Sequence, residues 1–175
     1  ISEKQIELAK KQEMPGVTYE QMDCMNSDFV GEGGFDVVSG MMFIHYAKSK
    51  EQLHKVLKNV HLALKDDGVF YAMTVNPNLL KNGYEEYGIK ITPQDKIEGG
   101  ESLIELHDFD WNKFCEFKIH SWSKETYREI FESEGFQIEW KDGVVSEEGI
   151  NKYGKEFWQD FMDNPAYVII KAFKK

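Results

Sequence analysis

Hydrophobic and polar positions follow two different periods along this chain of 175 residues. Ser49 and Gln52 have the spacing of a capping box, and apolar residues recur at helical intervals from Leu53 to Leu64. This pattern predicts an amphipathic helix. Two apolar runs, Phe35–Val38 and Val69–Val75, lie on either side of it. Strands this apolar, separated by helices, are typical of a parallel sheet that is covered on both faces.

A similar order is predicted for the start of the chain. A short helix is expected to follow a capping serine at Ser2 and to run through Lys10 or Gln12, before the stop signal Pro15-Gly16. The segment Val17–Asp23 alternates in the manner of a strand, and the polar, glycine-rich stretch Met25–Gly34 predicts a loop or a short helix.

The pattern changes after Pro77. Residues 78–100 are rich in Gly, Asn, Glu and Lys and have few apolar positions. Two alternating segments, Ser102–Asp110 and Phe114–Trp122, then predict an antiparallel hairpin. We therefore expect residues 78–122 to be an insertion that interrupts the α/β order.

The last third of the chain returns to that order. Ser123 is expected to cap a helix, and Phe136–Trp140 alternates as a strand. A last helix is predicted from Ser146 through Phe161, and Tyr167–Phe173 is the final strand. We expect residues 1–175 to form a single domain.

Composition narrows the choice of partners. The formal net charge is -10 and the sequence pI is about 5.0, so we expect neither nucleic acid nor an anionic membrane surface to be a partner. Cys24 and Cys115 are far apart and form no CxxC motif, which favours a reducing, cytoplasmic compartment. Neither a signal peptide nor a membrane-spanning apolar run is found after Ile1.

The ordered set of segments resembles the class I S-adenosylmethionine-dependent methyltransferases, read from their second helix onward. The segments that carry the resemblance are ISEKQIELAKK, VTYEQMDCM, FDVVSGMMFIHYAKSKEQL, LKNVHLALKDDGVFYAMTVNP and the tail from WSKETYREIF to AYVII. The tail is similar to a small-molecule subgroup of toxoflavin-biosynthesis type. The resemblance implies an α/β fold, with a Rossmann-like, mostly parallel sheet whose last strand runs antiparallel between its neighbours.

The chain departs from the family pattern at its start. The glycine-rich loop after the first strand and the acidic residue after the second, which hold the cofactor S-adenosylmethionine in the family, have no counterpart here. The fold is therefore expected to be N-terminally truncated, and this chain alone to bind the cofactor weakly. We also expect an apolar edge beside Phe35–Val38, covered by a partner chain, by self-association or by upstream residues.

The resemblance assigns cofactor contacts to two segments. Asp23 would accept a hydrogen bond from the adenine amino group, and the backbone N–H of Cys24 or Met25 would meet a ring nitrogen. The second segment follows the fourth strand of the family fold and consists of Ser39, Gly40 and Met41. The alternatives are that Asp23 caps the following turn and that the second segment is ordinary turn and core.

Candidate residues for the substrate lie after these segments. His45 is a possible general base, although a lone histidine is more often packed or hydrogen-bonded. The residues expected to contact substrate are Tyr46, Asn76, Tyr84, Trp111, Trp122 and Trp158. Either an aromatic lid over a small substrate or plain packing of the insertion would explain the aromatic residues Tyr84, Tyr87, Trp111, Trp122 and Trp158. No metal site is expected, because strand alternation separates His107 from Asp108 and Asp110.

These observations predict methyl transfer from S-adenosylmethionine to a small molecule that is held under residues 78–122. The methyl group of a sulfonium is already activated, so the missing catalytic triad counts little against an enzyme. The alternative is a methyltransferase-like structural or binding module that does not bind the cofactor.

Overall fold

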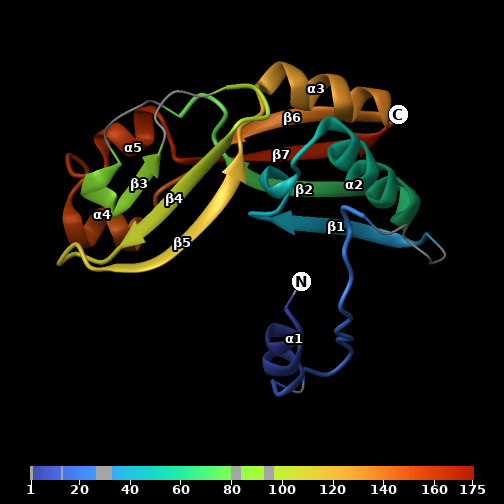
Figure 1. Cartoon of the computed structure of the whole chain (residues 1–175), viewed down its shortest axis with the longest axis horizontal. Coiled ribbons are helices and arrows are strands. Elements are labelled where there is room, and N and C mark those ends of the chain that lie inside the picture. Colours follow the sequence, from blue (N-terminus) through green and yellow to red (C-terminus); the bar gives the residue numbers. More distant parts are fainter. Residues whose placement is uncertain (1, 13, 27–32, 80–83, 93–96) are drawn as a thin grey trace.

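A four-stranded sheet organises the molecule. The structure is a computed structural model that describes residues 2–12, 14–26, 33–79, 84–92 and 97–175. The strand order is β1 (Phe35–Met41), β2 (Leu64–Val75), β7 (Tyr167–Lys174) and β6 (Phe136–Asp142). β1 and β2 are parallel, and β7 is antiparallel to both β2 and β6 (Figure 1). The predicted antiparallel final strand between two neighbours is confirmed.

Two capped helices bury their apolar residues against this sheet. The Ser49 hydroxyl accepts from the Gln52 N–H at 3.3 Å at the start of α2 (Lys50–Ala63). The Ser123 hydroxyl accepts from the Thr126 N–H at 3.1 Å at the start of α3 (Lys124–Ser133). The main core combines residues of both helices with β2, β6 and β7: Leu53, Val56, Leu57, Ile130, Phe131, Phe70, Ala72, Phe136 and Ile170. Burial of each large side chain contributes about 1.5–3 kcal/mol to folding.

The opposite face of β1 is open among the described residues. Val37 and Met41 alternate along the strand and are 56% and 55% exposed, and Phe35 is 54% exposed. β1 is also the edge of the described sheet. The structure thus has the apolar edge that the sequence predicts, and nothing in the described chain covers it.

The predicted strand at Val17–Asp23 is absent. These residues form an extended segment between α1 (Glu3–Lys10) and the body, and α1 itself has no buried residues. Figure 1 shows α1 set apart from both sheets. A strand needs a neighbour to pair its backbone groups, and no described segment lies alongside this one. The predicted Ser2 cap is present, with Ser2 accepting from the Gln5 N–H at 3.4 Å.

The insertion is a small antiparallel sheet in the order β3 (Ile89–Thr92), β4 (Glu101–His107) and β5 (Lys113–His120), preceded by the short helix η2 (Glu85–Tyr87). The predicted hairpin corresponds to β4 and β5, whereas β3 was not predicted. Parts of two predictions, residues 27–32 of the loop and residues 80–83 and 93–96 of the insertion, lie outside the described residues.

Three further boundaries differ from the prediction. β1 continues through Met41, so Ser39 and Gly40 lie within the strand rather than after it. β2 begins at Leu64 instead of Val69. The single helix predicted from Ser146 is two helices, α4 (Glu147–Tyr153) and α5 (Gln159–Asp163), because Gly154 adopts a positive φ of 86° that ends the first.

Among the described residues, no helix has both the length and the hydropathy required to cross a bilayer.

Candidate functional site

A pocket of about 130 Å³ lies where the carboxyl end of β2 meets the small sheet. Val75 and Asn76 come from the end of β2, and Ser102 and Ile119 come from β4 and β5. The remaining wall includes His45 from the short helix η1 (Ile44–Tyr46) and Tyr127 from α3. In open α/β sheets, ligands bind beyond the carboxyl ends of the parallel strands, which is where this pocket opens.

His45 is the most unusual side chain in the pocket wall. It is 1% exposed, and its Nδ1 lies 3.1 Å from Thr74 Oγ1. Its Nε2 is buried and has no hydrogen-bond partner among the described residues. Burial lowers the pKa of His45 to about 4, so the ring is neutral at pH 7. A buried nitrogen without a partner costs about 1–3 kcal/mol of stability.

Thr74 and Tyr127 extend this polar group into the core. Thr74 is fully buried in β2, and the Tyr127 hydroxyl interacts with it from α3. Burial raises the pKa of Tyr127, so its hydroxyl stays protonated. The sequence analysis missed both residues as site candidates. The available signal was a threonine in the otherwise apolar run Val69–Val75.

Asn76 and Trp122 line the pocket as predicted, but their polar atoms serve the fold. Asn76 Nδ2 donates to the Pro165 carbonyl at 2.8 Å. Trp122 Nε1 donates to the Ala47 carbonyl at 3.0 Å, which ties the end of the small sheet to η1. These bonds hold the two walls in place and leave the apolar surface of the indole for a ligand. Their contact with substrate stays a prediction.

Tyr46 lies next to His45 but does not line the pocket. Its ring centroid is 4.6 Å from that of His45, and it is 38% exposed. Burial of its hydroxyl raises the pKa of Tyr46. Its ring therefore supports the imidazole from the outside, and a role for Tyr46 in substrate contact is also untested.

The structure does not bring Tyr84, Trp111 and Trp158 into the pocket. Tyr84 donates to the Asn164 carbonyl, and Trp158 donates to the Gly149 carbonyl at 3.0 Å while stacking on Tyr87. Tyr84 and Trp158 belong to a second apolar core between the small sheet and the C-terminal segment. Trp111 lies in the turn between β4 and β5 and is 46% exposed.

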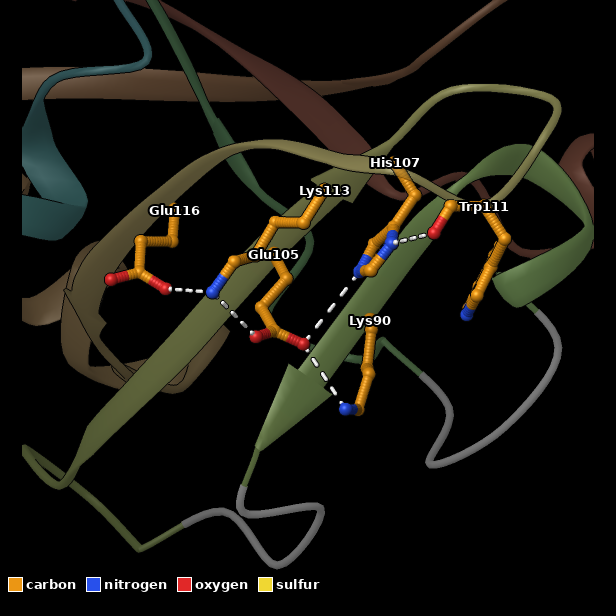
Figure 2. A network of polar contacts seen from close by, with 6 residues as sticks. All are labelled: Lys90, Glu105, His107, Trp111, Lys113 and Glu116. Atoms are coloured by element: carbon orange, nitrogen blue, oxygen red, sulfur yellow. Dashed lines mark hydrogen bonds and ion pairs between the residues drawn. The ribbon is translucent and has the colours of Figure 1, made fainter.

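Charged side chains on β3, β4 and β5 form a paired network that includes the Trp111 turn (Figure 2). Glu105 lies 3.1 Å from Lys90 Nζ and 3.3 Å from Lys113 Nζ, and these lysines lower the pKa of Glu105. Lys113 also pairs with Glu116 at 2.6 Å. His107 Nδ1–H donates to the Trp111 carbonyl at 3.2 Å, and the two rings stack. This network links the three strands, and none of its members lines the pocket.

The residues predicted to bind the adenine lie beside α2 and outside the pocket. The Asp23 carboxylate accepts from the Met25 N–H at 3.1 Å and from Asn26 Nδ2 at 2.8 Å, and the Asn26 amide lowers the pKa of Asp23. Asn59 Nδ2 donates to the Cys24 carbonyl at 3.1 Å, and Met25 packs on the main core. Asp23 thus caps a turn in this structure, and each carboxylate oxygen can still accept a second hydrogen bond.

The second predicted cofactor segment lies in the carboxyl half of β1. A Cβ at Gly40 would lie 3.3 Å from the Phe70 ring, so a larger residue here would have to displace that ring by a few tenths of an ångström. Ser39 and Met41 point to the open face, where Met41 is more than half exposed. The cofactor roles of all six residues stay predictions. Among the described residues, no three His, Cys, Asp or Glu side chains gather as a metal site would require.

Comparisons with known proteins agree on one family. Residues 1–140 match a family described as a methyltransferase domain. The chain is similar in structure to an S-adenosylmethionine-dependent methyltransferase from Mesorhizobium loti, with 17% identity, a TM-score of 0.66, and coverage of 98% of this chain and 76% of the other. It is also similar to the amino pentose methyltransferase CalS10 from Micromonospora echinaspora, solved with S-adenosylmethionine bound, with 13% identity, a TM-score of 0.63, and coverage of 100% and 72%.

The chain also has a relative in sequence among the mRNA cap methyltransferases. The chain is 36% identical over 77 residues to the mRNA cap guanine-N(7) methyltransferase of Aspergillus niger. The match covers 43% of this chain and 12% of the relative, so the chain spans a small part of that protein's length.

Proposed function

Since the chain belongs to the methyltransferase domain family, we propose that it forms the acceptor-binding part of an enzyme that methylates a small molecule with S-adenosylmethionine. The observation that carries the proposal is the pocket at the carboxyl end of β2, which is the position at which open α/β sheets bind their ligands.

The residues present fit one end of the cofactor. Asp23 is ionised at neutral pH, because its pKa is lowered, and each carboxylate oxygen can accept a second hydrogen bond from an adenine amino group. The exposed Met41 offers an apolar surface at the end of β1. When bound, S-adenosylmethionine supplies a methyl group that is already activated on its sulfonium sulfur.

The side chains of the pocket then act by holding and shielding the acceptor. Apolar residues such as Val75, Leu79 and Ile119 exclude water from the acceptor. A pKa of about 4 makes His45 a weak base at pH 7, so it is poorly suited to act as a general base.

Charge supports a small molecule over capped RNA. The net charge is -10, and three lysines of the small sheet, Lys90, Lys113 and Lys118, are all paired with glutamates. Binding of a phosphate chain requires cations that are free to replace counterions. The partial likeness to cap methyltransferases is the reason to include capped RNA in the test.

The test uses the protein encoded by the whole gene, S-adenosylmethionine with a labelled methyl group, a panel of small phenols, amines and heterocycles, and guanosine-capped RNA. Mass spectrometry identifies the labelled product. Label in a small molecule supports the proposal. Label only in capped RNA, or in neither class, contradicts it, and the second result would favour the non-catalytic module.

A further inference from the structure

An acidic side chain, Glu98, lies in the wall of the pocket and remains exposed to solvent. Its two carboxylate oxygens accept from the Ser123 N–H at 3.1 and 3.3 Å, at the start of α3. Ser123 and Tyr127 line the same pocket. Burial is the main cause of the raised pKa of Tyr127, and the negative charge of Glu98 adds to it. The carboxylate group itself therefore lies at the pocket, close to two of its lining residues.

No lysine or arginine in the wall balances this carboxylate, among the described residues that line the pocket. Burial lowers the pKa of His45 to about 4, so this lining histidine is uncharged at pH 7. The N–H groups of Ser123 and Thr126, which could attract an anion to the start of α3, donate to Glu98 and to the Ser123 hydroxyl instead. The charges at the pocket therefore favour a cation over an anion.

Glu98 can bind a ligand while it holds the start of α3. An ionised carboxylate has about four acceptor sites, and the donors that Glu98 meets here are the N–H and the hydroxyl of one residue, Ser123. An ammonium group carries only donors, so it matches the acceptor sites that remain. A hydrogen bond between opposite charges is also about twice as strong as one between neutral groups.

The rest of the pocket limits the size and polarity of the ligand. Its volume of about 130 Å³ is well below the ~300–1,000 Å³ of pockets for drug-sized ligands, and apolar cavities of about 150 Å³ take up benzene. Val75, Leu79 and Ile119 contribute aliphatic surface, and the Trp122 indole is held by its bond to the Ala47 carbonyl. These walls suit an apolar group about the size of one six-membered ring.

We propose that the pocket binds a small amine in its ammonium form, with its apolar body inside the pocket and its nitrogen hydrogen-bonded to Glu98. The inference rests on the proposed function only in making this amine the methyl acceptor. Binding of the amine itself requires neither the cofactor nor methyl transfer.

Methyl transfer to an amine is consistent with the same charge. The ammonium group first loses a proton to water, because only the uncharged nitrogen has a free electron pair. The nitrogen then bonds to the methyl carbon as the carbon–sulfur bond breaks, and the electrons of that bond stay on sulfur. The positive charge thus passes from sulfur to a nitrogen beside Glu98, whose carboxylate stabilises it as it develops.

The test compares three probes with one ring, benzylamine, benzyl alcohol and benzoate, titrated into the complete protein without cofactor. The titrations are done at pH 8, where benzylamine is an ammonium ion and an ordinary histidine is neutral. Affinity is measured by NMR, and the indole signal of Trp122, assigned with Trp122→Phe, reports whether a probe enters this pocket. We expect benzylamine to shift that signal and to bind about 5- to 10-fold more tightly than benzyl alcohol, between the effects of a buried charged hydrogen bond and of an exposed ion pair. Benzoate is expected to bind more weakly than both.

Glu98→Gln should lower the affinity for benzylamine to that for benzyl alcohol and leave the alcohol unchanged, because glutamine keeps an oxygen for Ser123 but removes the charge. Glu116→Gln is the matched control, because Glu116 pairs with Lys113 outside the pocket, and it should change neither affinity (Figure 2).

Equal affinities of the parent for benzylamine and benzyl alcohol, tighter binding of benzoate, or benzylamine binding that leaves the Trp122 signal unchanged would overturn the inference, and none of these readouts requires that Glu98→Gln folds. A preference for benzylamine that persists in folded Glu98→Gln would overturn it too. Amine-selective binding without methyl transfer to any small molecule would contradict the proposed function alone, whereas transfer to small molecules without this selectivity would contradict the present inference alone.

Discussion

Among single residues, Asp23 has the role in cofactor binding that can be tested most simply. Its carboxylate lies outside the core, where it caps the turn to Asn26. Removal of a side chain that lies outside the core should leave the fold nearly intact, whereas loss of a charge-assisted hydrogen bond to the adenine should weaken binding.

We therefore predict that Asp23→Ala in the complete protein weakens binding of S-adenosylmethionine about tenfold or more. Asp36→Ala is the matched control, because Asp36 is also an aspartate outside the core but pairs with Lys65. Calorimetric titration gives the affinities, and melting curves verify folding. Unchanged affinity in Asp23→Ala would show that this turn does not hold the adenine.

His45 predicts how stability depends on pH. The imidazole has a pKa of about 4 in the fold and 6.5 when unfolded, so between these values the unfolded state binds the additional proton. The contribution of the neutral imidazole to stability is therefore complete above pH 6.5 and is lost as the pH falls. The loss is about 3 kcal/mol at pH 4. Urea unfolding of the parent and of His45→Phe between pH 7 and 4.5 should give a steeper loss for the parent. Parallel curves would mean that His45 is not buried as a neutral ring.

At the level of helices and strands, stability depends on what each element buries. Ser49 and Ser2 cap their helices with the same bond, but α2 contributes to the core, whereas α1 has no buried residues. Loss of a cap typically costs about 1 kcal/mol. This cost lowers the free energy of global unfolding only when the helix unfolds together with the core.

Ser49→Ala is therefore predicted to lower the free energy of unfolding by about 1 kcal/mol, and Ser2→Ala to leave it unchanged. Chemical denaturation of both variants beside the parent measures this. An equal loss in Ser2→Ala would show that α1 packs on the body in solution.

The same elements show which parts of the fold a sequence can reveal. The caps at Ser49 and Ser123 were predictable because they depend on residues three positions apart. The strand predicted at Val17–Asp23 was wrong because a strand depends on a distant neighbour that local alternation cannot reveal. β3 was missed because four residues in a polar stretch carry too little pattern.

The candidate site was predictable only in part, for a related reason. His45, Asn76 and Trp122 were named as candidates from the resemblance and from their residue types, and all three line the pocket. Thr74 and Tyr127 were missed because their meeting depends on the packing of α3 over β2. Tyr84 and Trp158 pack in a second core that the order of elements did not predict.

For the molecule as a whole, the open face of β1 is the main structural liability. Phe35, Val37 and Met41 expose apolar surface on an edge strand, an arrangement that promotes association. We predict that this chain alone self-associates at high concentration and that Val37→Lys shifts it towards monomer. Val144→Lys is the control, because Val144 is 78% exposed and lies outside the sheet. Sedimentation velocity measures the distribution, and a monodisperse parent chain would contradict the prediction.

The central claim is that the methyl acceptor occupies the pocket between β2 and the small sheet. The most direct measurement uses the methylated product formed with ¹³C-labelled cofactor and retained on the protein. Isotope-filtered NMR then records which protein protons lie near the transferred methyl group. The account predicts contacts to the Trp122 ring and the Ile119 methyl groups. A product that contacts only residues elsewhere, such as the exposed turn at Trp111, would contradict it.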